Sequence, residues 1–148
     1  MKMFLSLLLV VLAILGIFDA SYLTYEKLTG NIPPCGAGFD CGEVLSSQWA
    51  SIGPIPLSMF GFFFYSSMFI LAIINFLEID LFDHIITTKK LLLLLGSFGF
   101  FFSLYLVSLM AFIIQAWCLY CLFSALISTS LFVTSVALNN LPPSTPSK

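Results

Sequence analysis

The sequence predicts an all-α integral membrane protein: a bundle of four transmembrane helices with an extracytoplasmic loop that carries a short helix. Hydrophobic residues make up 60% of the 148 residues and charged residues only 8%, whereas a soluble domain carries roughly 25% charged residues. The hydrophobic residues form runs of the length that crosses a bilayer, about 20 residues. A single domain of this size has too small a core to bury such runs, so lipid must cover them.

Four hydrophobic runs define the predicted helices. They cover about residues 3–25, 55–77, 91–113 and 117–138. The first run continues past the usual length of a signal peptide, and Phe18-Asp19-Ala20 is a poor cleavage site, so we expect a retained helix. The last two runs come from one uncharged stretch, and we place a tight turn at its most polar point, near Gln115.

The charged residues predict the orientation of this membrane domain, which covers residues 1–138. Lysines concentrate on the cytoplasmic side of membrane proteins, and with the N-terminus inside, only Lys27 of the five lysines lies outside. Both termini are therefore expected in the cytoplasm, together with the proline-containing tail 139–148, which is predicted to be disordered. Five lysines, no arginine and a formal charge of −2 exclude nucleic-acid binding, which needs a cationic patch.

Four cysteines in two close pairs are the candidate reactive groups. Cys35 and Cys41 lie in the outer loop, and Cys118 and Cys121 follow the predicted turn into the fourth helix. Both pairs are thus expected at the extracytoplasmic face, where disulfides form and persist. In the C-x-x-C pair the two sulfurs lie on one helix face. The helix N-terminus favours a thiolate at Cys118, while Cys121 lies one turn deeper, toward a lipid-soluble reactant.

The loop pair has a similar local arrangement. Asp40 and Glu43 have the spacing of a capping box, which predicts a short helix over about 41–50 on the membrane surface. Cys41 would lie in its first turn, and Cys35 on an accessible segment rich in proline and glycine.

Three other interpretations of the cysteines remain open. The first is a zinc site, although neither a C-x5-C pair nor a pair in an apolar helix is typical of zinc ribbons. The second is a purely structural disulfide between Cys35 and Cys41. The third is inert packing of Cys118 and Cys121. A redox relay agrees best with the spacing and the shared membrane face, so we predict no metal site.

Several stretches, taken in order along the chain, resemble one known family. They are Asp19–Tyr25 at the end of the first helix, Cys41–Trp49 in the loop, Pro56–Gly61 at the start of the second helix, Ser103–Leu106, and Trp117–Cys121. Their order on four predicted helices is similar to that of the vitamin K epoxide reductase family, and the resemblance covers most of the chain. It implies an oxidoreductase that exchanges thiols and disulfides and uses a quinone.

The resemblance also implies a role for each cysteine. Cys35 would exchange with an external thioredoxin-like protein, Cys41 would pass electrons to Cys118, and Cys121 would face the quinone. Ser47 matches the family's active-site loop serine, with an expected role as a hydrogen-bond donor. From the residues alone, the alternative for Ser47 is a solvated position on the loop helix.

Two positions of this chain differ from the animal members of the family. Those members hold a naphthoquinone with an Asn and a Tyr, and the matching positions are Leu57 and Ala125. With Phe60, these two are the candidate residues of the quinone pocket. The difference favours the bacterial role in an inner or plasma membrane, in which ubiquinone or menaquinone takes electrons from a disulfide-introducing protein. Because the chain ends at Lys148, we expect that thioredoxin-like partner to be a separate protein.

Two alternative functions remain beside this one. The chain could be a vitamin K quinone or epoxide reductase that draws electrons from small or protein dithiols. It could also be a non-enzymatic four-helix membrane protein whose disulfides are structural and do not cycle. Asp19 is the acid within the first hydrophobic run, and such residues are functional candidates. It would either handle a proton at the quinone or pair with a nearby Tyr or Ser.

Overall fold

Four long helices make up most of the structure, a computed structural model that describes residues 1–77 and 85–141. They are α1 (Lys2–Thr29), α3 (Leu57–Phe76), α4 (Ile85–Leu109) and α5 (Leu119–Asn139). Each is long and apolar enough to cross a membrane, α4 together with the π-helical turn η2 (Met110–Ile114) that follows it. The predicted class, an all-α bundle of four transmembrane helices, is confirmed. Of the predicted tail, residues 142–148 lie outside the described part of the chain.

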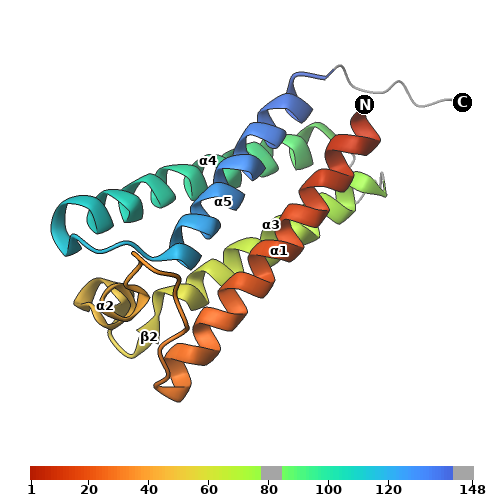
Figure 1. The fold of residues 1–148 in the computed structure, drawn as a ribbon. Helices are drawn as coiled ribbons and strands as arrows, with labels where there is room; N and C mark the ends of the chain where they lie inside the picture. The colour runs from red at the N-terminus through yellow and green to blue at the C-terminus, as the bar shows by residue number, and fades with distance from the viewer. Residues whose placement is uncertain (78–84, 142–148) are drawn as a thin grey trace, which may run out of the picture.

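The helices pack around a core that depends on small residues at the closest approaches. Helix α1 lies against α3 and α5, and α4 lies against α5 and α3 (Figure 1). Gly16 of α1 faces the ring of Tyr65, and a Cβ at that position would overlap the ring. Gly96 brings α4 against the backbone of α5 at Phe132, where a Cβ would lie 3.3 Å from the Cα. Such small residues let membrane helices approach closely.

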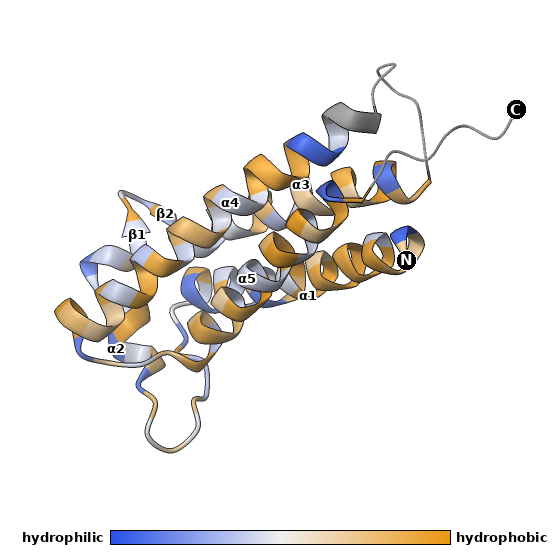
Figure 2. Cartoon of the chain, turned by 90° about the horizontal axis from the view of Figure 1, so that it is seen from above, coloured by the Kyte–Doolittle hydropathy of each residue, from blue (hydrophilic) through white to orange (hydrophobic). Residues whose placement is uncertain are grey.

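The outer surface of the bundle is hydrophobic. Phe4, Phe63, Leu94 and Phe101, spread over three helices, each expose more than half of their surface. Hydrophobic residues predominate along the length of the long helices (Figure 2). Water would not tolerate an apolar surface of this extent, but the hydrocarbon of a bilayer covers it without cost. The protein is therefore an integral membrane protein.

The segment between α1 and α3 lies at one end of the bundle, opposite the start of α1 and the end of α5 (Figure 1). It contains α2 (Cys41–Ser46), the short 3₁₀ turn η1 (Gln48–Ala50), and a hairpin of β1 (Ser51–Ile52) and β2 (Ile55–Pro56). The strands are antiparallel, and Ser51 pairs with Pro56. The sequence did not predict this hairpin, because its strands are too short to show an alternating pattern.

The loop helix is shorter than predicted. It begins as expected at Asp40, whose side chain accepts a hydrogen bond of 3.0 Å from the N–H of Glu43. It ends at Ser46, because Ser47 has extended backbone angles and its hydroxyl donates to the carbonyl of Val44. A serine that bonds to the preceding turn in this way competes with continuation of the helix.

The turn between α4 and α5 contains the predicted polar point, with an unforeseen conformation. After the π-helical turn, Gln115 adopts a left-handed backbone (φ 56°), and residues 116–118 are not helical. Helix α5 therefore begins at Leu119, later than predicted. Cys118 is its N-cap residue rather than part of its first turn.

Candidate active site

All four cysteines lie together at the end of the bundle that carries α2. Cys41 and Cys118 are 1% and 0% exposed, and they share a hydrophobic cluster with Val44, Met110 and Ala116. Cys35 and Cys121 pack against the same cluster and are partly buried. Residues from the loop and from the α4–α5 turn, far apart in the sequence, thus form one compact sulfur-containing site.

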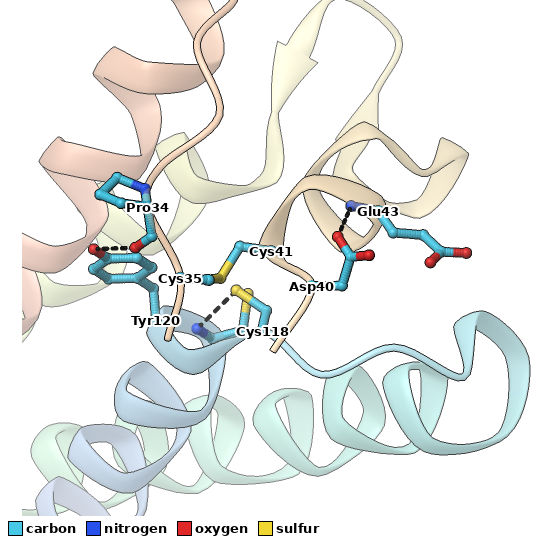
Figure 3. The surroundings of a disulfide bond; sticks show 8 residues. Pro34, Cys35, Asp40, Cys41, Glu43, Cys118 and Tyr120 are labelled. Carbon is cyan, nitrogen blue, oxygen red and sulfur yellow. Dashed lines mark hydrogen bonds between the residues drawn. A yellow bond between two sulfur atoms is a disulfide. The ribbon is translucent and has the colours of Figure 1, made fainter. Parts of the chain in front are cut away.

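Cys35 and Cys41 form a disulfide beside Cys118 (Figure 3). Their Cα atoms are 6.0 Å apart, a usual separation for a disulfide. Cys41 is the first residue of α2 and points into the cluster, whereas Cys35 is half-buried and is followed by the exposed residues 36–40. One sulfur of the pair is therefore close to the surface and the other is close to Cys118.

Two long-range hydrogen bonds hold the loop against the C-x-x-C pair. The N–H of Asp40 donates to the carbonyl of Trp117 over 2.9 Å. The hydroxyl of Tyr120 donates to the carbonyl of Pro34 over 3.2 Å (Figure 3). Each bond joins a neighbour of a loop cysteine to a neighbour of Cys118. Sequence reasoning missed both bonds, because no local pattern marks a contact between segments so far apart.

Cys118 and Cys121 are free thiols with different surroundings. The N–H of Cys121 donates to the sulfur of Cys118 over 3.3 Å. The hydrogen bond from the Cys121 side chain, with backbone N–H groups of Cys121 and Tyr120, lowers the pKa of Cys118, although its burial acts in the opposite direction. A thiolate is the nucleophile in disulfide exchange, and the lowered pKa favours that form at Cys118.

Cys121 lines a cavity of about 380 Å³ that extends among the four long helices below α2. This volume is in the range of small-molecule sites. The predicted site residues Ser47, Leu57, Phe60 and Ala125 all line the same cavity. Aromatic rings form much of the remaining wall, from Phe64, Phe98 and Phe102. The arrangement suits a flat, lipid-soluble ring compound that lies within reach of a thiol.

Helix α2 forms the roof of this cavity through Val44 and Leu45, with Ser47 immediately after it. Lys27, near the end of α1, donates a hydrogen bond to the carbonyl of Leu45 and so ties α1 to this roof. Sequence reasoning used Lys27 only for orientation. Lys27 is the one lysine expected on the extracytoplasmic side, and this exception could have indicated a specific structural contact.

Two buried polar atoms also belong to the cavity wall. Within the described residues, Asp19 Oδ2 and Ser128 Oγ are buried side-chain atoms without a hydrogen-bond partner. Both side chains line the cavity, and both are more than nine-tenths buried. The other buried hydroxyl nearby, that of Tyr65, bonds to the carbonyl and hydroxyl of Ser124 at 2.8 Å each. The cavity thus offers polar groups to a ligand at two defined points.

Comparison with known proteins agrees with this chemistry. The sequence model of the vitamin K epoxide reductase family matches residues 7–136, a range that contains all four cysteines. The thiol-disulfide oxidoreductase LTO1 of Arabidopsis thaliana is 35% identical over 125 residues, which cover 80% of this chain and 32% of that protein. The chain thus spans about a third of the length of this relative.

Proposed function

Because this chain belongs to the vitamin K epoxide reductase family and is a membrane oxidoreductase of thiol–disulfide chemistry, we propose that it oxidises an extracytoplasmic thioredoxin-like protein and passes the electrons to a membrane quinone. The observation that carries this proposal is the contact of three groups: a loop disulfide, a thiolate-forming Cys118, and a cavity faced by Cys121. A relay needs these groups in this order.

The first exchange takes place at the loop pair. A thiolate of the partner attacks the sulfur of Cys35, a mixed disulfide forms, and Cys41 leaves as a thiolate. The second thiol of the partner then attacks the mixed disulfide, so that the partner leaves oxidised and Cys35 and Cys41 remain as thiols. The half-buried position of Cys35 beside exposed residues supports its role as the sulfur that the partner reaches.

The second exchange moves electrons into the C-x-x-C pair. The Cys41 thiolate attacks the sulfur of Cys118 in a Cys118–Cys121 disulfide, and Cys121 leaves. Cys35 then attacks Cys41, which restores the loop disulfide and leaves Cys118 and Cys121 as thiols. The structure has the loop pair as a disulfide and the second pair as thiols, the arrangement that follows this transfer.

The last exchange takes place in the cavity. A bound quinone supplies a two-electron acceptor that takes up two protons. Cys118 and Cys121 give up these electrons and protons and close to a disulfide, with Cys121 on the side of the ring. Leu57, Phe60 and Ala125 hold the ring through apolar contacts, and the tie between Lys27 and Leu45 keeps α2 over the cavity and excludes water. Ser47 lines the cavity that would hold the ring, while its hydroxyl bonds to Val44.

This function requires the site to face the extracytoplasmic side, as in a bacterial inner or plasma membrane. The lysine distribution supports that orientation, with the N-terminus and the end of α5 in the cytoplasm. Disulfide formation belongs to that compartment, because cytosolic reductants keep thiols reduced.

The relay can be tested by trapping its first intermediate with a thioredoxin-like protein that keeps one cysteine, activated as a mixed disulfide with thionitrobenzoate. In Cys41→Ala the free thiol of Cys35 displaces thionitrobenzoate, and no second thiol is present to release the partner, so a covalent adduct should accumulate on a non-reducing gel and disappear with reductant. Cys118→Ala should instead retain the internal Cys35–Cys41 disulfide and lose steady-state quinone reduction. Ser46→Ala, an exposed neighbour on α2, serves as the control with unchanged turnover.

Two outcomes would contradict the proposal. One is an unchanged rate of partner oxidation in both Cys35→Ala and Cys41→Ala, which would make the loop disulfide structural. The other is near-normal quinone reduction in Cys118→Ala, which would remove Cys118 from the relay.

A further inference from the structure

The two unpartnered buried polar atoms in the cavity have no task in the relay described above. Asp19 comes from α1 and Ser128 from α5, and their side chains are 8% and 1% exposed. A buried polar atom without a partner costs stability. Two such atoms on the wall of one cavity indicate that a ligand supplies the hydrogen-bond partners that the protein lacks.

The neighbouring polar groups cannot serve that ligand equally well. Tyr65 and Ser124 already bond to each other, and the hydroxyl of Ser47 bonds to Val44. Thr24 and Ser58 likewise bond to each other, at 2.9 Å. Leu57 and Ala125, on which the family resemblance placed ring contacts, carry no hydrogen-bonding side chain. Among the fully buried side-chain atoms in the described part of the chain, Asp19 Oδ2 and Ser128 Oγ are the two that lack a hydrogen-bond partner.

One of these two groups packs closely against a glycine. Gly99 of α4 lies beside Ser128, and a Cβ at Gly99 would come within 2.9 Å of the Ser128 hydroxyl and would overlap the ring of Phe64. All three residues line the cavity. A glycine at this position lets the Phe64 ring and the Ser128 hydroxyl pack against α4, where a larger side chain would displace both.

We propose that Asp19 and Ser128 form the hydrogen-bonding subsite that receives the oxygens of the bound quinone ring. The chemistry of the pair suits both redox forms of such a ring. The hydroxyl of Ser128 donates to a quinone carbonyl, and a carboxylate oxygen of Asp19 accepts from the hydroxyl of a quinol. The subsite thus positions the ring, while the cysteines exchange the electrons. The proposal rests on the proposed function, because it names the part of the ring that this cavity recognises.

The test measures binding, in oxidised protein that has no thiols to give electrons. Wild type and variants in lipid nanodiscs are dialysed to equilibrium against menadione or against methylnaphthalene, which has a similar ring without the oxygens. Ser128→Ala and Asp19→Leu should each weaken menadione binding about fivefold, the effect of one hydrogen bond. Binding of methylnaphthalene should remain within twofold of wild type, roughly the scatter of additive contacts.

Three further measurements separate a subsite from a structural effect. Ser135→Ala is the matched control, because Ser135 is equally buried on α5 but its hydroxyl bonds to Leu131; it should leave menadione binding unchanged. Asp19→Asn, which keeps hydrogen-bonding atoms, should recover most of the affinity lost in Asp19→Leu. Ligand-free Ser128→Ala should unfold at the same temperature as wild type or higher, because an unpaired buried hydroxyl has been removed.

The outcomes distinguish this inference from the relay itself. If wild type oxidises the partner with menadione as acceptor and both Ser128→Ala and Asp19→Leu bind menadione normally, the relay stands and the subsite is wrong. An equal loss of methylnaphthalene binding would also overturn the subsite, since it would show a change in cavity shape. If wild type binds no menadione and does not turn over, both proposals fail.

Discussion

At the scale of single residues, Cys118 combines complete burial with a lowered pKa. Burial alone disfavours a thiolate. The hydrogen bond from the thiol of Cys121, supported by backbone N–H groups, outweighs this effect and lowers the pKa. A thiolate held inside a cluster is out of reach of most oxidants. It can react with the sulfurs that pack beside it, those of Cys41 and Cys121.

This environment predicts the pH at which Cys118 ionises. In a variant without the loop cysteines, the ultraviolet absorbance of the thiolate should rise at a pH below the ordinary range of a free thiol. Because the folded-state pKa is the lower one, the thiolate stabilises the fold above the ordinary pKa, and this contribution is lost as the pH falls through the lowered value. Adding Cys121→Ala should move the midpoint upward, since the main donor is gone.

Cys121→Ser is the matched control for that experiment, because its hydroxyl still donates a hydrogen bond. Its midpoint should lie between those of the parent and Cys121→Ala. Equal midpoints in the parent and Cys121→Ala would mean that the neighbouring thiol does not determine the ionisation of Cys118.

At the scale of elements, the loop is positioned by hydrogen bonds to the start of α5. The bonds from Asp40 to Trp117 and from Tyr120 to Pro34 join neighbours of the loop cysteines to neighbours of Cys118. These two hydrogen bonds hold the loop cysteines at a fixed distance from the C-x-x-C pair. The ring of Tyr120 also packs on that of Tyr22 of α1, with centroids 5.4 Å apart. Three segments of the chain thus meet at one tyrosine.

Removing one of these bonds should slow transfer between the cysteine pairs. Tyr120→Phe keeps the ring but loses the bond to Pro34, a net effect of about 1 kcal/mol, or roughly fivefold in rate. Stopped-flow oxidation of a reduced thioredoxin-like protein should show this loss, while single-turnover oxidation of the C-x-x-C pair by menadione stays unchanged. Tyr105→Phe, at an exposed tyrosine of α4, is the control, and an equal effect in both variants would contradict the role of this bond.

Elements differ in how far the sequence alone predicts them. The hydrophobic runs predicted the four long helices, because a bilayer requires length and apolarity together. The spacing of Asp40 and Glu43 predicted the start of α2, a local signal. The end of α2 at Ser46 was not predicted, since it follows from the extended backbone and hydroxyl bond of Ser47, which no sequence pattern marks. The N-cap position of Cys118 was not predicted either, since it follows from the left-handed turn at Gln115. The same holds for the candidate site: the sequence indicated the cysteines, but the bonds of Tyr120 and Lys27 needed the structure.

At the scale of the whole molecule, one long helix lies between the site and each end of the bundle's chain: α1 before the loop and α5 after Cys118. The loop and the hairpin lie at one end of the bundle, and the start of α1 and the end of α5 lie at the other (Figure 1). The proposed relay would therefore meet its protein partner on one side of the membrane only. The distribution of the lysines determines which side this is, because each lysine contributes a small preference for the cytoplasm during membrane insertion.

This orientation predicts the labelling of two new cysteines. In a background without the native cysteines, Ser51→Cys in the hairpin should react with a membrane-impermeant maleimide from outside intact cells. Asn139→Cys, at the end of α5, should react only after the membrane is permeabilised, which also serves as the control for accessibility. The reverse pattern would place the cysteine site in the cytoplasm and would contradict the proposed compartment.

Because α2 both carries Cys41 and roofs the cavity, a movement of α2 would affect two events of turnover. These are the transfer of electrons to Cys118 and the release of the quinone ring. A shift of α2 that is wide enough to release the reduced quinone would also move Cys41 away from Cys118. Electrons would then have no route inward until the roof returned. Reduction of the Cys118–Cys121 pair and exchange of the quinone ring would thus alternate. While the cavity is open, the sulfurs of Cys118 and Cys121 would not be newly reduced. Oxygen and water that enter the cavity would therefore find no newly formed thiol.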